Sequence, residues 1–399
     1  MPNAVRPAPS LFRPALSRRG ALAIFLGGAA AASGAWAADP TGWSAVDQLG
    51  EAVVADHIAP GFSISVMKGG AFIYSKGFGL ANLEIPTPAT PHHVYHVGSV
   101  TKQFTAAALA LLAQEGKLSF DDRLSKFIPE FPRAADVTLA QMLHHTSGIG
   151  NYTNQPRPQD FQQAARLDYD NPALLKAMID LTKPAYVFEP GTDWAYSNTA
   201  YVLLGLIVEK VSGESCVSFY KRRLFDPAGM TQTAVDNMAD VVPYRASGYS
   251  GHPGSSTAFD NTSYISMTFP GAAGNIRSTT EDLCRWHLAL FGGRIVSPES
   301  LAAMIKPGRL NNGALPLAAM KPGPKTPLKY GFGLQTDDFD GHVMIGHNGG
   351  INGFITTLHS FPKEGVTVAI LINGDPSGRP TFMPRMQAIQ DAAARTALI

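Results

Sequence analysis

The stretch HVGSVTKQFTAAALALL, residues 96–112, decides the fold. From Ser99 onward apolar residues recur at spacings of three and four, which predicts a helix with one buried face: Val100, Phe104, Ala107, Ala108, Leu111 and Leu112. Upstream, residues 62–66 alternate apolar and polar, and two glycines turn the chain into residues 71–74, which predicts a β-hairpin. A strand therefore gives way to a helix at Ser99.

Strand-like alternation returns near the carboxyl end, in residues 330–334, 342–345, 354–358 and 366–371. We expect residues 50–98 and 328–399 to form one antiparallel sheet, with a last amphipathic helix over residues 383–398 covering one face. Residues from about 118 to 290 show helical patterns without clear strands. The predicted fold is α/β (α+β): an antiparallel sheet flanked by terminal helices, with an inserted all-helical lobe.

The amino-terminal segment has the pattern of an export signal. A twin arginine, Arg18-Arg19, precedes an apolar run over residues 21–32, which is too short to span a bilayer. Small residues at Ala35 and Ala37 suit a signal peptidase. We expect residues 1–37 to be a twin-arginine-type signal peptide and the mature protein to be periplasmic or secreted, without a stable membrane anchor. An uncleaved anchor helix is the alternative.

Charge argues against a nucleic-acid partner. The formal net charge is +1, and four arginines precede the first acidic residue, Asp39, so the chain beyond them carries −3. A nucleic-acid-binding protein would show a basic footprint. We therefore expect a small-molecule or short-peptide substrate as the partner, and the oligomeric state stays open.

Neither a metal nor another cofactor is expected. The chain has no His-Glu-x-x-His motif, and the histidines at 92, 93 and 96 have no acidic or cysteine neighbours in the sequence. The two cysteines, Cys216 and Cys284, lie in helix-like surroundings that favour buried thiols, although export would permit a disulfide. Whether they pair stays open.

A Ser-x-x-Lys motif on a helix places an amine beside a hydroxyl that it can activate. The motif occurs four times, and the copies at residues 65–68 and 360–363 fail because one lies in a strand pattern and the other contains a proline. The copy at residues 218–221 lies on a charged, exposed helix face. Ser99 with Lys102 stands at a helix start, where the backbone favours developing negative charge. A simple helix cap is the alternative for Ser99.

Two further motifs complete the candidate site. Tyr196-x-Asn198 lies between a turn at residues 188–191 and an apolar helix, so a phenol and an amide are held on one rigid loop. The alternative is that Asn198 only caps that helix and Tyr196 packs. The run His347-Asn348-Gly349-Gly350 is expected at the end of a strand, where glycines let a substrate backbone approach; a surface hairpin is the alternative. The other Tyr-x-Asn copies are not held between such a turn and an apolar helix, and the other His-x-Gly copies do not end a predicted strand that faces another.

The order of these three motifs resembles the serine β-lactamases of the class C type and their relatives: penicillin-binding proteins, D-Ala-D-Ala carboxypeptidases, D-aminopeptidases and esterases (S12-type serine hydrolases). The resemblance covers nearly all of residues 38–399, which it implies form one catalytic domain with a β-lactamase/transpeptidase-like fold. It rests on residues 96–102, 142–148, 188–205, 278–282, 330–333 and 346–354.

The resemblance implies a role for each position. Ser99 would be the acyl-accepting nucleophile, Lys102 and Tyr196 the pair that handles protons, and Asn198 a substrate ligand. The strand residues His347, Asn348 and Gly349 would line the substrate, and the backbone N–H groups of Ser99 and Gly350 would form the oxyanion hole. Whether Lys102 or Tyr196 takes the serine proton stays open, because both groups are ordinarily protonated at neutral pH.

The sequence departs from the β-lactamases of this group at His347, where they carry lysine. Lysine offers a fixed positive charge to a substrate carboxylate, whereas histidine is only partly charged near neutrality. We therefore predict a serine hydrolase that acts on a small amide or ester, with a D-amino-acid peptide ahead of a carboxylic ester. The alternatives are a β-lactamase with weak β-lactam turnover and a non-hydrolytic penicillin-binding or sensor protein. The chain contains no Gly-x-Ser-x-Gly for an α/β-hydrolase.

Overall fold

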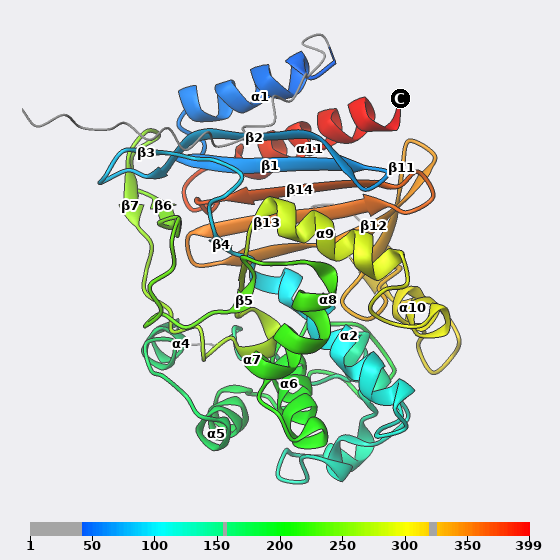
Figure 1. The fold of residues 1–399 in the computed structure, drawn as a ribbon. Helices are drawn as coiled ribbons and strands as arrows, with labels where there is room; N and C mark the ends of the chain where they lie inside the picture. Colours follow the sequence, from blue (N-terminus) through cyan, green and yellow to red (C-terminus); the bar gives the residue numbers. More distant parts are fainter. Residues whose placement is uncertain (1–41, 155–157, 319–324) are drawn as a thin grey trace, which may run out of the picture. The chain divides into compact units, whose positions relative to one another are not determined.

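The computed structural model describes residues 42–154, 158–318 and 325–399. A seven-stranded antiparallel sheet with the order β11-β12-β13-β14-β1-β2-β3 joins both ends of this part of the chain (Figure 1). Its strands are β1 (Gly61–Lys68), β2 (Ala71–Asn82), β3 (Thr87–Pro88), β11 (Gln335–Phe339), β12 (His342–Ile351), β13 (Phe354–Phe361) and β14 (Val366–Ile372). The predicted signal peptide at residues 1–37 lies outside the described residues. No helix in the described ranges is long and apolar enough to cross a membrane.

The predicted hairpin forms as β1 and β2. Gly69 and Gly70 both adopt positive φ, 59° and 84°, which lets the two strands pair directly on either side of them. The polar residues of β1 do not face solvent, however: Ser63 and Ser65 are fully buried. The Ser65 hydroxyl is satisfied by the hydroxyls of Ser75 at 2.8 Å and Thr280 at 2.7 Å. The central strand is therefore covered on both faces.

The two faces of the sheet are covered by different helices. On one face lie α1 (Ser44–Ala55) and α11 (Phe382–Leu398), which bury the apolar side chains of β1 and β14 that alternate toward them. The terminal helix predicted over residues 383–398 is thus present. On the other face lies α9 (Thr280–Phe291), in front of the strands in Figure 1. The lobe predicted over residues 118–290 includes most of this helix, so the prediction assigned to the lobe a helix that packs on the sheet.

The predicted strand over residues 330–334 is wrong. The chain there turns, with the Gly331 N–H donating to the Leu334 carbonyl at 2.7 Å, and the strand β11 begins only at Gln335. Gly333 has φ 65° and lies against the backbone of Lys102, where a Cβ would come within 2.7 Å of the carbonyl oxygen. The glycines that completed the alternating pattern serve instead to bend the chain around the helix below it.

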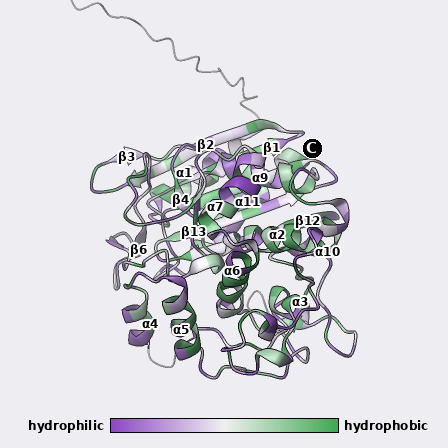
Figure 2. Cartoon of the chain, turned by 60° about the horizontal axis from the view of Figure 1, so that its bottom comes forward, coloured by the Kyte–Doolittle hydropathy of each residue, from purple (hydrophilic) through white to green (hydrophobic). Residues whose placement is uncertain are grey.

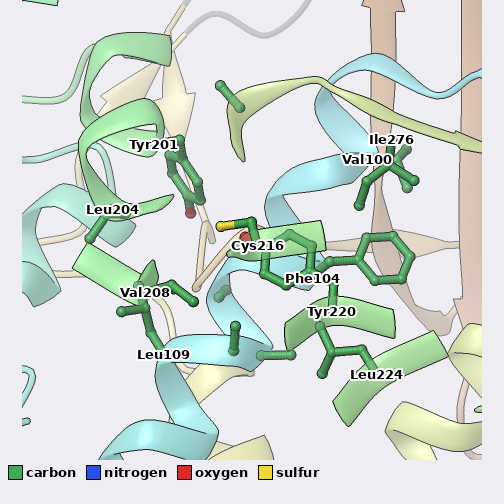
Figure 3. Packing of buried hydrophobic residues seen from close by; sticks show 14 of the residues in the cluster. Val100, Phe104, Leu109, Tyr201, Leu204, Val208, Cys216, Tyr220, Leu224 and Ile276 are labelled. Carbon is green, nitrogen blue, oxygen red and sulfur yellow. The ribbon is translucent and has the colours of Figure 1, made fainter. Parts of the chain in front are cut away.

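The lobe is built around two helices, α2 (Thr101–Gln114) and α6 (Asn198–Ser212), whose hydrophobic residues pack together (Figures 2 and 3). Cys216 lies in this core, and Cys216 and Cys284 are both buried free thiols rather than a disulfide. Around the pair lie α3 (Leu139–Leu143), α4 (Pro158–Ala164), α5 (Asn171–Leu181), α7 (Cys216–Tyr220), α8 (Asp226–Ala228) and α10 (Pro298–Ile305).

The lobe also contains short strands, so it is not all-helical as predicted. A three-stranded sheet has the order β4-β8-β5, and β6 pairs with β7. Each of these strands has only two or three residues, too few for an alternating pattern to appear in the sequence. They are β4 (Tyr95–His96), β5 (Ala234–Val235), β6 (Tyr249–Gly251), β7 (Phe259–Asn261) and β8 (Ile276–Ser278); a separate pair outside the lobe joins β9 (Leu317–Ala318) to β10 (Thr326–Pro327).

Candidate active site

Ser99 lies in a single 3₁₀ turn, Gly98–Val100, that leads directly into α2. The turn is pressed against β12, since Gly98 has φ 51° and a Cβ there would lie 2.8 Å from the carbonyl oxygen of Gly350. Only glycine tolerates both the left-handed backbone and this approach. The sequence Gly98-Ser99 therefore places the serine at a helix start and beside the strand.

The glycines of β12 allow the same close approach from the side of the strand. A Cβ on Gly349 would lie 2.0 Å from the Val97 carbonyl oxygen and 3.2 Å from the Ser99 nitrogen. The motif lies in the last part of β12, which ends at Ile351, and it is paired with β13 along this stretch. Its other neighbour, β11, stops pairing at Gly346, so the edge of the strand beyond that residue is left for the turn that carries Ser99.

Lys102, one turn after Ser99, is fully buried and has three hydrogen-bond partners. Its Nζ lies 3.2 Å from Ser99 Oγ, 2.7 Å from Asn198 Oδ1 and 2.8 Å from the Ala273 carbonyl oxygen. Burial lowers the pKa of Lys102 well below its ordinary value. Since the amide and carbonyl oxygens can only accept, a neutral amine donates its two hydrogens to them and directs its lone pair at the Ser99 hydroxyl.

Tyr196 and Asn198 are held at the start of α6. Ser197 is the residue that caps this helix, through its side chain and the N–H of Ala200 at 3.1 Å, so Asn198 is free for another task. Its Oδ1 accepts from Lys102, which leaves the NH₂ end for a substrate carbonyl. The Tyr196 hydroxyl oxygen is buried without a well-formed hydrogen bond among the described residues. Burial raises the pKa of Tyr196, and the Ser99 side chain opposes this in part.

His347 is buried beside this group, and both of its ring nitrogens have partners. Nε2 lies 2.9 Å from the Tyr330 hydroxyl, and Nδ1 is hydrogen-bonded to the Asn348 carbonyl. Burial and, next, the nearby Lys102 lower the pKa of His347 to about 3. The imidazole is therefore neutral near pH 7, and it is not the surface imidazole of the alternative interpretation.

Three contributions to the site were not predicted. The Ala273 carbonyl comes from a short 3₁₀ turn, Gly271–Ala273. Every residue has a backbone carbonyl, so the residue type cannot show which one accepts a hydrogen bond from Lys102. His145 and Tyr330 are buried next to His347, and both lie in stretches that carried the family resemblance. Their histidine and tyrosine side chains, in glycine-containing loops, were the available signal.

Two cavities meet at Ser99. One, the mixed cavity, has a volume of about 290 Å³ and both apolar and polar lining residues: Ser99, Tyr152, Thr153, Phe161, Asn198, Ile265, Pro270, Ala273, Gly274, Gly350, Ile351 and Asn352. The other, the polar cavity, has a volume of about 360 Å³ and is lined mostly by residues with polar side chains: Ser99, Tyr196, Gln335, Asp337, Met344, His347, Asn348, His359, Gln387 and Gln390. A carbonyl carbon at Ser99 would thus have room for one substituent on each side. In the described part of the chain no cluster of His, Cys, Asp or Glu could hold a metal ion.

Comparison with known proteins agrees with this geometry. The family model described as "Beta-lactamase" matches residues 46–392. Penicillin-binding protein 4* of Bacillus subtilis is 30% identical over 326 residues, which cover 78% of this chain and 67% of that protein. The D-stereospecific amidohydrolase from Streptomyces superposes with a TM-score of 0.72 at 27% identity, covering 88% and 98% of the two chains. The octameric penicillin-binding protein homologue from Pyrococcus abyssi gives 0.72 at 28% identity, covering 88% and 77%.

Proposed function

Because the chain belongs to the β-lactamase family of serine hydrolases, we propose that it hydrolyses a small amide or ester through a covalent acyl-enzyme on Ser99. The observation that carries the proposal is the position of the Lys102 amine between Ser99 Oγ and two oxygens that can only accept. An amine held this way removes the serine proton as the hydroxyl attacks.

Lys102 rather than Tyr196 is the general base in this proposal. Its lowered pKa makes a neutral amine available near pH 7, whereas the raised pKa of Tyr196 keeps the phenol protonated. The phenol then donates a proton to the leaving group, and Lys102 returns one to it. The second half of the cycle reverses these roles with water as the nucleophile.

The carbonyl oxygen of the substrate takes the charge that develops during attack. The N–H groups of Ser99 and Gly350 are the proposed donors, and the close packing of Gly98 and Gly349 across the contact with β12 supports this assignment. Asn198 also lines the mixed cavity, where its NH₂ can hold a second carbonyl of the acyl group.

An amide of a D-amino acid or D-peptide is the substrate class we favour over a carboxylic ester. The likeness to the D-stereospecific amidohydrolase supports this choice. Efficient β-lactam turnover is not expected, because the neutral His347 offers no fixed charge to the carboxylate that these compounds carry. His347 serves in this proposal to hold the substrate-lining strand, with Asn348 and Gly349 facing the substrate.

The test is to measure turnover of a p-nitrophenyl ester, a D-alanyl amide, its L-alanyl counterpart and a chromogenic cephalosporin by the residue 38–399 protein and its Ser99→Ala variant. We expect Ser99-dependent turnover of the D-amide and the ester, with the cephalosporin slowest. Stable acylation without release of product would instead favour a penicillin-binding or sensor protein. Turnover that persists in Ser99→Ala would refute the proposal.

A further inference from the structure

A chain of hydrogen bonds behind the nucleophile joins four distant parts of the sequence. The Ser197 N–H lies 3.2 Å from His145 Nδ1, and His145 Nε2 lies 3.2 Å from the Tyr330 hydroxyl. That hydroxyl lies 2.9 Å from His347 Nε2, and His347 Nδ1 meets the Asn348 carbonyl. His145, Tyr330 and His347 are all buried, so none of these contacts can be exchanged for water without cost.

The two ends of this chain fix the direction of every bond in it. A backbone N–H can only donate, so His145 Nδ1 accepts and its proton is on Nε2, which donates to Tyr330. A carbonyl can only accept, so the proton of His347 is on Nδ1 and its Nε2 accepts. The Tyr330 hydroxyl receives from His145 and has one hydrogen to donate; the Tyr201 hydroxyl also lies beside it, and we assign the donation to His347, whose Nε2 is the acceptor at 2.9 Å. Both imidazoles are neutral in this arrangement, each in a single tautomer.

His347 therefore has no free nitrogen for a substrate. The other titratable groups near His347 do not present a positive charge to an anionic group of the substrate. Lys102 is buried and engaged by three oxygens, the Tyr196 ring lies tilted with its centroid 6.2 Å away, and His359 approaches from β13. Burial is the main cause that disfavours a proton on His347, and a protonated Lys102 or His359 would only add to it.

The rest of the polar cavity is also without positive charge. None of the described residues that line it is lysine or arginine, and its one carboxylate is Asp337 on β11. Gln390 of α11 is 2% exposed and lines the same cavity, and its Oε1 has no hydrogen-bond partner. A buried free acceptor and a carboxylate suit a substrate group that donates hydrogen bonds, such as an amide NH₂ or an ammonium.

We propose that Tyr330 and His145 are positioning residues that set the substrate selectivity, by holding His347 neutral and fully occupied so that the polar cavity rejects carboxylates. The inference rests on the proposed function, since it concerns which substrates reach Ser99. The mixed cavity, where Phe161, Ile265 and Ile351 offer apolar contacts, takes the acyl group, and the polar cavity takes a leaving group that is neutral or cationic. Asp337 adds to the rejection of anions from the outer edge of the sheet.

The test compares two isosteric substrates, the phenylacetyl esters of 3-hydroxybenzamide and of 3-hydroxybenzoate. Their apolar acyl group directs both into the site in one orientation, and they differ only in a carboxamide or a carboxylate on the leaving group. For the unaltered protein we expect kcat/KM to be at least about tenfold lower for the carboxylate, the size of one unmade charge-assisted hydrogen bond. This ratio should not change between about pH 5 and pH 8, because His347 stays neutral throughout.

Tyr330→Phe removes one oxygen and frees His347 Nε2. Burial still disfavours the imidazolium, but a carboxylate bound at the freed nitrogen supplies a counter-charge that stabilises a proton there. The carboxylate-to-carboxamide ratio should therefore rise about tenfold near pH 5.5 and fall back as the pH rises to about 8. Loss of structure alone would slow both esters equally and leave their ratio and its pH dependence unchanged. Nitrogen-15 NMR of labelled histidine, with His347 assigned by His347→Gln, should show a non-titrating Nδ1–H tautomer in the unaltered protein.

Asp337→Asn is the second variant, and it does not disturb the core. It should raise the same ratio about two- to fivefold, as expected for one exposed charge, and added salt should reduce the gain. Asp338→Asn is the matched control, because Asp338 is the exposed neighbour on β11 and points to the opposite face. It should leave the ratio unchanged.

The outcomes separate this inference from the proposed function. If both esters are hydrolysed equally well in a Ser99-dependent reaction, or if His347 titrates between about pH 5 and pH 8 in the unaltered protein, the selectivity proposal is wrong while the hydrolase remains. If neither ester acylates Ser99, the proposed function fails and the selectivity proposal fails with it.

Discussion

At the scale of single residues, the proposed chemistry depends on a buried amine whose pKa is lowered by its burial. Among the described residues Lys102 has no carboxylate partner; its amine contacts a hydroxyl, an amide oxygen and a carbonyl oxygen, with the rings of Tyr196 and Tyr201 beside it. Burial disfavours the ammonium form, and three neutral oxygens do not compensate fully for the lost hydration. The same burial that costs stability therefore supplies a base at neutral pH.

Replacing this amine should abolish catalysis without unfolding the protein. Lys102→Met keeps a similar length and removes a buried polar group, so we expect the free energy of unfolding to be equal or higher. The acylation rate should fall by about 10²- to 10⁴-fold, the usual contribution of a general base. Lys221→Met, in the exposed Ser-x-x-Lys copy at residues 218–221, is the matched control and should retain full activity. Equal losses in the two variants would contradict the assignment.

The pH profile of acylation should follow the same group. The neutral amine is the active form, so kcat/KM should rise as the pH rises through the pKa of Lys102 and then reach a plateau. Because burial lowers this pKa well below its ordinary value, the plateau should be reached well below the pH at which an ordinary lysine loses its proton. A profile that keeps rising to the pKa of an ordinary lysine would show that the amine is not desolvated as described.

At the scale of elements, the site depends on the contact between the turn that carries Ser99 and the strand β12. Glycines on both sides allow the two backbones to touch. Gly349→Ala would place a Cβ 2.0 Å from the Val97 carbonyl oxygen, so the strand must move away from the serine. We expect the acylation rate to fall at least about 100-fold, the cost of one lost oxyanion donor. Acylation kinetics, with circular dichroism to confirm folding, would measure this.

Gly42→Ala serves as the control for that substitution. An added Cβ there meets only Thr396 Cγ2 at 4.0 Å, which is an ordinary contact. Its activity should match that of the unaltered protein. An unchanged acylation rate in Gly349→Ala would mean that the strand and the serine do not form the oxyanion site together.

Sequence patterns predicted some elements and missed others for physical reasons. The terminal helix was predicted because its periodicity reflects one buried face. The hairpin was predicted from its alternating residue types and the turn at Gly69 and Gly70, although both faces of β1 are buried. Residues 330–334 failed because Gly331 and Gly333 match an alternating pattern while allowing a bend, and only tertiary contact with Lys102 distinguishes the two. The short strands of the lobe are held by neighbours distant in sequence and carry no local signal.

The same limit applies to the site. The side chains of Ser99, Lys102, Tyr196 and Asn198 lie around one point, as their motifs predicted, since each motif couples a reactive group to a fixed backbone setting. The partners that tune them were not predictable, because the Ala273 carbonyl and the orientation of the Tyr330 hydroxyl arise only when remote loops meet. The roles of the motif residues stay predictions until they are tested.

At the scale of the whole molecule, a buried charge cluster fastens the small sheet β4-β8-β5 beside the site. Asp236, which follows β5, accepts from His96 on β4 and Arg277 on β8, and also from Arg245 at 2.7 Å. Burial alone would raise the pKa of Asp236, but the hydrogen bonds from His96, Arg245 and Arg277 outweigh it and lower the pKa. One carboxylate thus joins strands that are about 180 residues apart.

Asp236→Asn should destabilise the protein by about 3 kcal/mol at neutral pH, because it removes a fully buried counter-charge from two partly buried arginines. Denaturant unfolding measures this. Because the pKa of Asp236 is lowered in the folded protein, its carboxylate contributes its full stabilisation above the pKa of the unfolded state. This stabilisation is lost as the pH falls through the pKa of the folded state. The difference between the two proteins should therefore narrow below about pH 4. Asp240→Asn, which removes an exposed partner of Arg277, should cost less than about 1 kcal/mol.

Export of the whole molecule by the signal peptide predicted at residues 1–37 stays a prediction. Replacing Arg18 and Arg19 with lysine should trap the protein in the cytoplasm if the twin arginine directs export. Cell fractionation with an antibody to the carboxyl-terminal helix would report this. Export that continues unchanged would argue against a twin-arginine signal.

The most direct test of the account is to locate the covalent intermediate. The protein should be quenched with acid during turnover of a phenylacetyl ester, digested and analysed by mass spectrometry. We expect the acyl mass on the peptide that contains Ser99, also in the Ser218→Ala variant, and no adduct or turnover in Ser99→Ala. An acyl group on Ser218, or hydrolysis that continues without Ser99, would contradict the central claim.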